Sequence, residues 1–215
     1  MEDYHRICEA IGPGDYSLAH YFSGNHIIVR HDVDDKVNLA IEIADIEHSQ
    51  GIRSTYYFRY RGDDSERNAL LSIRSMGHEI GFHYETLAKA GGDKEWAVRL
   101  FKDQLAALRE IADIKTVCPH GSRGYRNHKI MSEYLQRECA LIGDAYLDVD
   151  FGNLDYYSDS GNQWHVYQKL SDHLDNPDKK LDRVAVELLD VIKAIESGDN
   201  VYIATHPQHW TQNVK

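Results

Sequence analysis

The sequence predicts an α/β fold in which helices cover a parallel sheet. Short runs rich in β-branched and aromatic residues alternate with longer stretches whose apolar residues recur at helical spacing. This alternation is typical of strands joined by crossover helices. With 215 residues, of which 42% are hydrophobic, the chain is long enough for one sizeable core. We therefore expect a single domain over residues 1–215, with its core at about residues 26–210.

The expected strands and helices follow one another along the chain. Strands are expected at about residues 26–31, 55–59, 79–83, 115–118, 145–147, 154–157 and 201–205. Helices are expected at about 36–50, from a cap at Asp64 or Ser65 to Gly77, and at about 93–112, 128–138 and 181–197. Residues 1–25 show no clear period, so we expect an irregular lead-in with one short helix at most. A polar loop is expected around Asn176 and Pro177.

Composition limits the classes of partner. A net charge of -11 argues against nucleic acid and anionic membranes. The odd set of Cys8, Cys118 and Cys139 has no CxxC spacing, which indicates free thiols in a reducing compartment. The amino terminus has no signal-peptide pattern, and no apolar run reaches transmembrane length. We expect a cytoplasmic location, and the sequence carries no signal of oligomeric state.

Polar residues gather where the expected strands end. Asp32 and Asp34 follow the first strand, His83 ends the third, and His120 and His206 follow later ones. Parallel α/β folds place their active sites at the carboxyl ends of the strands, so we expect these side chains to meet.

The first of these clusters has two interpretations. Asp32 and Asp34 are two apart on an extended chain and therefore point the same way. One carboxylate could then bind a metal while the second acts on the water beside it. Taken alone, the stretch fits equally well with a helix cap, in which Asp34 or Asp35 begins the helix from about Lys36.

Three motifs resemble those of the polysaccharide deacetylase superfamily (NodB homology, carbohydrate esterase family 4). They are His31–Asp34, Gly77–His83 and Ala204–Pro207, and their order covers nearly the whole chain. The resemblance implies a distorted (β/α)7 barrel, a divalent metal that is most often Zn²⁺, and hydrolysis of the amide of an N-acetylated sugar. Carried over by position, Asp32 would be the general base, Asp34 and His83 metal ligands, and His206 the general acid.

Two departures from the family's pattern bear on the site. The second metal histidine would fall at position 87, which is Leu87, and the arginine of the third motif is missing from the stretch around Pro119 and Gly121. We expect His120, or less favourably Glu85, to supply the missing ligand.

The function that this resemblance implies is metal-dependent hydrolysis of a C–N amide bond. On the same resemblance, the substrate would be a small N-acetylated sugar, an oligosaccharide or a sugar precursor in surface polysaccharide metabolism. Trp210 would either stack against a sugar or pack under the rim of the site. Asp144 and Arg126 are further polar candidates for orienting Asp32 or His206.

Two alternatives remain open. One is a non-catalytic carbohydrate-binding protein, marked by Leu87. The other is a different metal-dependent reaction at the same strand ends, such as deformylation or cleavage of a cyclic amide.

Overall fold

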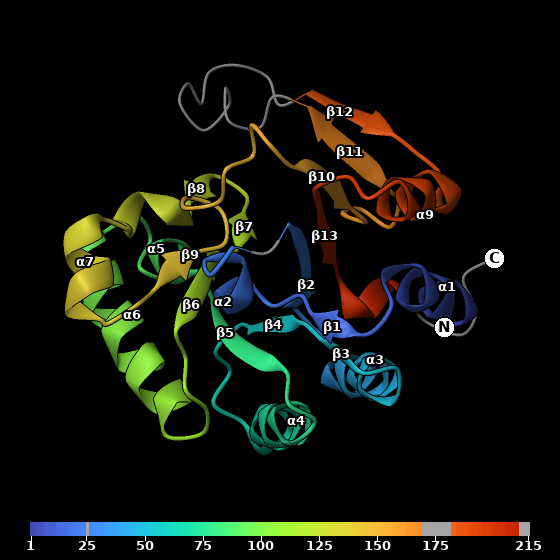
Figure 1. The fold of residues 1–215 in the computed structure, drawn as a ribbon. Coiled ribbons are helices and arrows are strands. Elements are labelled where there is room, and N and C mark those ends of the chain that lie inside the picture. Colours follow the sequence, from blue (N-terminus) through green and yellow to red (C-terminus); the bar gives the residue numbers. More distant parts are fainter. Residues whose placement is uncertain (25, 169–181, 211–215) are drawn as a thin grey trace.

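The computed structural model describes residues 1–24, 26–168 and 182–210, and its centre is a nine-stranded sheet (Figure 1). The strands follow the order β12–β11–β10–β13–β2–β4–β5–β6–β9. They are β2 (Ile27–Val33), β4 (Thr55–Phe58), β5 (Glu79–Tyr84), β6 (Thr116–Pro119), β9 (Gly143–Asp144), β10 (Asp155–Ser158), β11 (His165–Gln168), β12 (Asp182–Ala185) and β13 (Val201–Thr205). Pairing is parallel from β10 to β9, whereas β11 and β12 extend the β10 edge in antiparallel fashion.

Helices surround the parallel strands, as Figure 1 shows for α3, α4 and α6. The helices are α1 (Glu2–Ile11), α2 (Leu18–Tyr21), α3 (Val37–Ser49), α4 (Asp64–Ser75), α5 (Thr86–Lys89), α6 (Lys94–Arg109), α7 (Glu133–Glu138) and α9 (Leu188–Glu196), with 3-10 turns η1 (Asn127–Ile130) and η2 (Pro207–His209). Two small sheets pair β1 (Gly14–Asp15) with β3 (Ile52–Arg53), and β7 (Gly121–Ser122) with β8 (Tyr125–Arg126). None of these helices is long and apolar enough to cross a membrane.

The α/β class is confirmed, but the closed (β/α)7 barrel is not. Within the described part of the chain, β9 and β10 do not pair, so the sheet stays open between them. The segment between these strands is short and contains no helix. It packs Val149, Phe151 and Leu154 against the inner face of the sheet instead of continuing the ladder.

Three other expectations need correction. Residues 145–147, expected as a strand, form a turn that follows β9. The lead-in contains a full helix, α1, with Tyr4 and Ile7 buried against the core. The last helix begins at Leu188, because residues of the expected first turns form the edge strand β12, including Val184. The expected loop at Asn176 and Pro177, and the expected start of the last helix at Leu181, lie outside the described residues.

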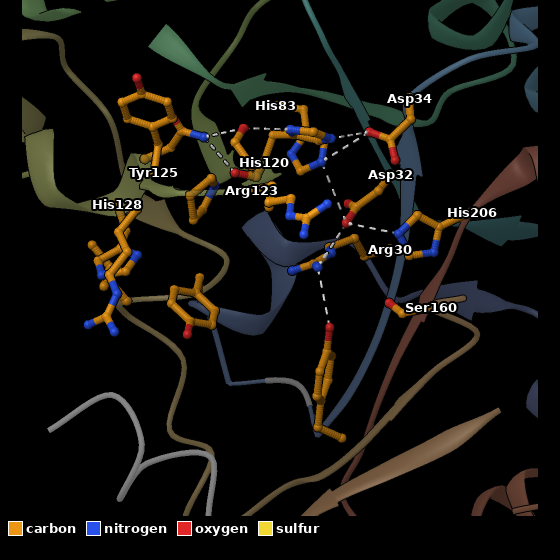
Figure 2. A pocket seen from close by; sticks show the side chains of 18 residues that line it. Arg30, Asp32, Asp34, His83, His120, Arg123, Tyr125, His128, Ser160 and His206 are labelled. Atoms are coloured by element: carbon orange, nitrogen blue, oxygen red, sulfur yellow. Dashed lines mark hydrogen bonds and ion pairs between the residues drawn. The ribbon is translucent and has the colours of Figure 1, made fainter. Parts of the chain in front are cut away.

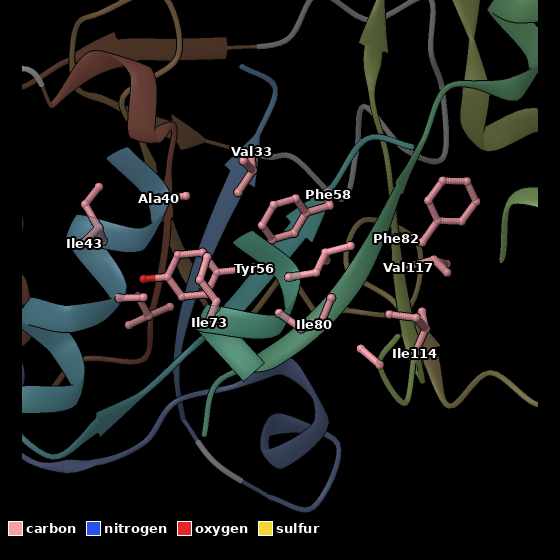
Figure 3. Packing of buried hydrophobic residues seen from close by; sticks show 14 of the residues in the cluster. Val33, Ala40, Ile43, Tyr56, Phe58, Ile73, Ile80, Phe82, Ile114 and Val117 are labelled. Carbon is pink, nitrogen blue, oxygen red and sulfur yellow. The ribbon is translucent and has the colours of Figure 1, made fainter. Parts of the chain in front are cut away.

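The two faces of the sheet have different environments because side chains alternate along each strand. Outward-facing residues such as Tyr56, Phe82 and Val117 pack under the helices and form the main core (Figure 3). The inner face carries a smaller cluster that includes Tyr57 and Tyr202. Towards the carboxyl ends of the strands, this inner face becomes polar.

Close packing on the inner face requires a glycine in β5. A Cβ at Gly81 would overlap Cε1 of Tyr57. The Tyr57 hydroxyl in turn donates a hydrogen bond of 2.9 Å to Thr116. Gly81 therefore leaves the space that the Tyr57 ring occupies.

A buried carboxylate on α3 ties the strands together on the outer face. Glu47 is 1% exposed, and its oxygens accept hydrogen bonds from Tyr4, Ser54 and Tyr56 and lie 3.0 Å from Nε2 of His31. Burial raises the pKa of Glu47, but His31 and the other partners outweigh it and lower this pKa to about 2. His31 also bonds Thr205, at 2.6 Å. Asp32 and His206 directly follow these two residues, so the network fixes the strands that carry them.

Candidate active site

A cavity of about 560 Å³ lies at the carboxyl ends of the parallel strands. Asp32, Asp34, His83, His120 and His206 all line it, and Figure 2 shows their side chains converging. Parallel strands end at a common edge, so residues far apart in the chain meet there.

Three of these side chains form a compact group. One ligand atom from each of Asp34, His83 and His120 lies within 4.8 Å of the others. Oδ1 of Asp34 is 3.5 Å from Nε2 of His83 and 3.4 Å from Nε2 of His120. That oxygen is buried, yet it has no hydrogen-bond partner among the described residues. A buried carboxylate oxygen without a donor is costly, and a cation between the three groups would remove the cost.

The rings of His83 and His120 are each oriented by a contact of Nδ1, the nitrogen that is not near Asp34. Nδ1 of His83 lies 3.1 Å from the carbonyl of Cys118, which can only accept, so Nδ1 carries the proton and Nε2 is free to bind. Nδ1 of His120 lies 3.2 Å from the hydroxyl of Ser122. Burial, and then the neighbouring His83, lower the pKa of His120. This favours the neutral ring that a metal requires.

The chain around His120 holds it firmly. Its N–H donates to the carbonyl of Tyr84 at 2.8 Å, and its carbonyl accepts a 2.7 Å bond from the amide of Asn127. The competing candidate Glu85 is engaged elsewhere, since Arg59 and Lys89 donate to it or pair with it at 2.7 and 3.0 Å. Two nitrogens and one carboxylate oxygen suit Zn²⁺ or another first-row divalent ion.

Leu87, at the position where the family has its second histidine, is not a lining residue. It lies on α5, is 6% exposed and belongs to the hydrophobic core. Its side chain is therefore separate from the cluster around Asp34.

Other nearby groupings suit a metal less well. One adds Cys118 to Asp32 and His83, but burial raises the pKa of the Cys118 thiol and disfavours the thiolate. Another is built around Asp159, whose oxygens already accept hydrogen bonds from the main chain and the ring of His206.

Asp32 lies beside the compact group and is held by an arginine. Nη2 of Arg30 donates to its Oδ2 at 2.9 Å, whereas its Oδ1 is buried without a hydrogen-bond partner in the described structure. Nε2 of His83 and Nε2 of His206 lie 3.8 and 3.9 Å from Oδ2. Burial raises the pKa of Asp32, but Arg30 and then the two histidines lower it to about 2. Asp32 is therefore ionised at neutral pH.

Sequence reasoning missed Arg30. It is 6% exposed, and its other contacts are the hydroxyls of Tyr202 at 2.9 Å and Tyr156 at 3.4 Å. Arg30 precedes Asp32 by two residues on the same strand, so the period of the strand was enough to predict that both face the cavity.

His206 is paired with a second carboxylate, Asp159. The distance from Nδ1 of His206 to Oδ1 of Asp159 is 2.6 Å. Burial lowers the pKa of His206, but the hydrogen bond to Asp159 and the charge of Asp32 raise it overall. Asp159 lies beside His206 because the preceding residues, Ser158 and Ala204, pair between β10 and β13. No local motif encodes this pairing.

The remaining predicted residues do not reach Asp32. Trp210 is buried outside the cavity, with its ring 5.1 Å from that of Tyr4, and its N–H donates to Asp159 at 2.9 Å. Of the two placements expected for Trp210, the structure shows packing under the rim of the site. Asp144 accepts from Tyr84 at 2.8 Å, and Arg126 lines the far wall of the cavity.

Comparison with known proteins gives a limited result. No family model matches the chain, and neither does any curated protein. Among solved structures, it is similar to a BA3943 mutant described as a CE4 family pseudoenzyme with restored enzymatic activity, at 10% identity and a TM-score of 0.49, covering 84% of this chain and 56% of that one. A second BA3943 mutant, described as a CE4 family pseudoenzyme, matches at 10% identity and a TM-score of 0.47, covering 84% and 55%.

Both structures carry the name of the family that the three motifs resemble. The chain spans little more than half of their length. At this identity and TM-score, neither match assigns a role to any residue of this chain.

Proposed function

We propose that the protein is a metal-dependent hydrolase of a C–N amide bond that deacetylates an N-acetylated sugar or sugar precursor. The observation that supports this most is the group of Asp34, His83 and His120, with an unpartnered buried carboxylate oxygen at its centre. Asp32 and His206 flank the group on one side, within 4 Å of each other. Together they provide a metal site, a base and an acid around one cavity.

Asp34, His83 and His120 would hold the divalent ion, and the donor set favours Zn²⁺. When bound, such an ion polarises an amide carbonyl and makes a neighbouring water more acidic.

Asp32 is the proton acceptor in this proposal. Its Oδ2 is held by Arg30, which leaves Oδ1 free to take a proton from the attacking water. The same guanidinium keeps the carboxylate ionised, so the base is available at neutral pH. A low pKa makes Asp32 a weak base, so it can accept the proton only from a water whose own pKa has been lowered.

His206 is the proton donor. Amide cleavage needs a proton on the departing nitrogen, because an amine anion is a very poor leaving group. Asp159 raises the pKa of His206 and fixes Nδ1, which directs Nε2 into the cavity on the side of Asp32. The protonated ring can then give the Nε2 proton to the amine.

The test measures metal content and acetate release on the same preparations. The zinc-loaded protein should hold about one ion per chain and release acetate from an N-acetylated sugar. His120→Ala should lose the ion and the activity, whereas His128→Ala, another histidine of the same cavity, should keep the ion. Asp32→Asn should keep the ion but lose acetate release. A His120→Ala protein that binds zinc as tightly as the wild type would refute this ligand set.

A further inference from the structure

The cavity wall formed by β7 and β8 is basic. Arg123 lies in the turn between these strands, Arg126 lies on β8, and both line the cavity. The carboxylates that line the cavity are Asp32 and Asp34. This balance contrasts with the chain as a whole, whose net charge is -11.

The two carboxylates of the cavity already have an ion-pair partner or a proposed role as a metal ligand. Asp32 is paired with Arg30 at 2.9 Å, and Asp34 belongs to the group with His83 and His120. Arg123 makes no hydrogen bond or ion pair with any residue of the described ranges. Its side chain is exposed and, as Figure 2 shows, extends into the cavity between His120 and Arg30.

The hairpin that carries Arg123 is fixed relative to the metal-ligand candidate His120. Ser122 pairs with Tyr125 across the turn, and the amide of Asn127 donates both to the carbonyl of His120 and to the hydroxyl of Ser122. Gly124 completes the turn with a φ of 82°, a conformation that glycine adopts without strain. Arg123 is thus presented by a braced turn three residues after His120.

We propose that the substrate carries an anionic group, a phosphate or a carboxylate, and that Arg123 binds it. A guanidinium offers paired N–H donors that match the oxygens of either group. The inference rests on the proposed function for the position of the amide, beside Asp34 and Asp32. The substrate of the proposed hydrolase is then a charged sugar, whose anionic group lies on the side of the scissile amide that faces the β7–β8 hairpin.

The kinetic test compares charged and neutral substrates. N-acetylglucosamine 1-phosphate, N-acetylmuramic acid and methyl N-acetylglucosaminide supply the phosphate, carboxylate and neutral forms. Loss of a charge-assisted hydrogen bond in Arg123→Ala should reduce kcat/KM for the better charged substrate by about tenfold or more, and for the neutral one by less than about threefold. The matched control is Lys129→Ala, which removes an exposed cation outside the cavity and should change neither value. Of the two charged substrates, the one whose turnover depends on Arg123 identifies the group.

A direct binding test separates this inference from the proposed reaction. Inorganic phosphate is titrated by calorimetry into the wild type, Arg123→Ala and Lys129→Ala, each after removal of divalent ions with EDTA. Weakened binding in Arg123→Ala alone supports the anion site even if no substrate releases acetate, in which case only the hydrolase proposal fails. Equal turnover of charged and neutral substrates by the wild type, or equal phosphate binding by the wild type and Arg123→Ala, overturns the inference while acetate release still supports the hydrolase.

Discussion

Asp144 should make the protein less stable as the pH rises, and Asp144→Asn should remove this effect. The carboxyl is fully buried at the end of β9 and accepts hydrogen bonds from the hydroxyl of Tyr84 and the main-chain N–H groups of Tyr146 and Leu147. Burial raises its pKa more than these donors lower it, to about 7. The folded protein therefore keeps a proton on Asp144 that the unfolded chain releases near its ordinary value of 3.8.

The sign and size of the effect follow from linkage. Between pH 3.8 and about 7 the folded state binds more protons at this group than the unfolded state, so stability falls as pH rises. With about 1.4 kcal/mol for each pKa unit, the contribution of Asp144 should fall by about 2–3 kcal/mol between pH 5 and pH 8. Asparagine does not titrate and its carbonyl can still accept from the main chain.

The measurement is urea unfolding of the wild type and Asp144→Asn at several pH values from 5 to 8. All other groups titrate in both proteins, so the difference between the two free energies of unfolding isolates Asp144. The variant should gain about 2–3 kcal/mol on the wild type across this range. Asp113→Asn, which changes an exposed aspartate, should show a constant difference. A constant difference for Asp144→Asn as well would mean that its carboxyl is ionised in the folded protein, and would refute the reasoning.

Three further predictions concern the packing and the acid of the site. Glu47→Gln should lower the free energy of unfolding, measured in urea at pH 7, by about 3–5 kcal/mol. This loss should shrink as the pH falls from 4.5, the pKa of Glu47 in the unfolded chain, towards about 2, its pKa in the folded protein. An unchanged stability would contradict the stabilising role of the hydrogen bonds around Glu47. Gly81→Ala should cost about 1–3 kcal/mol because the Tyr57 ring must move, and a crystal structure with an unmoved ring would contradict this. Asp159→Asn should lower the pKa of His206, so the alkaline limb of the kcat/KM profile should shift to lower pH; an unshifted limb would remove His206 as the acid.

Most of the parallel strands and the long helices could be predicted because their signals are local. β2 is a β-branched run, and α6 repeats apolar residues over several turns. The extent of α1 was underestimated because its core-facing residues, such as Tyr4 and Ile7, are few and are separated by polar residues. β12 was assigned to a helix because Val184 continues the helical spacing of α9. Its strand conformation comes from pairing with β11, which is a tertiary contact.

In the candidate site, too, some residues could be predicted from the local sequence and others could not. The acids and histidines that line the cavity could be selected because each lies at, or just after, the carboxyl end of a strand, and the ends of parallel strands share one edge of the sheet. They are Asp32, Asp34, His83, His120 and His206. The partners of these residues required the register of the sheet. Asp159 meets His206 only because β10 lies beside β13, and Trp210 faces away from the cavity because η2 turns its ring into the core. Neither contact has a sequence spacing from which it could be predicted.

The two departures from the family's motifs have a common spatial explanation. A motif fixes a ligand by its distance along one element, whereas a metal requires only that donors converge at one point. β5 and β6 are neighbours, so a residue just after β6 can reach the point at which the side chain of His83 ends. In the proposed metal site His120 occupies that position, whereas Leu87 packs in the hydrophobic core.

The same reasoning applies to the missing arginine of the third motif. The cavity receives guanidinium groups from other elements, Arg30 from β2 and Arg123 from the β7–β8 hairpin. Arg30 sits on the same strand as the carboxylate that it holds, so the pairing is set by the two-residue period of that strand and needs no contribution from β6. Arg123 is then not required to hold Asp32, which leaves its charge available for a ligand. Arg123→Ala should accordingly leave acetate release from a neutral substrate nearly intact, whereas Arg30→Met, which leaves Asp32 buried without its counter-charge, should abolish it.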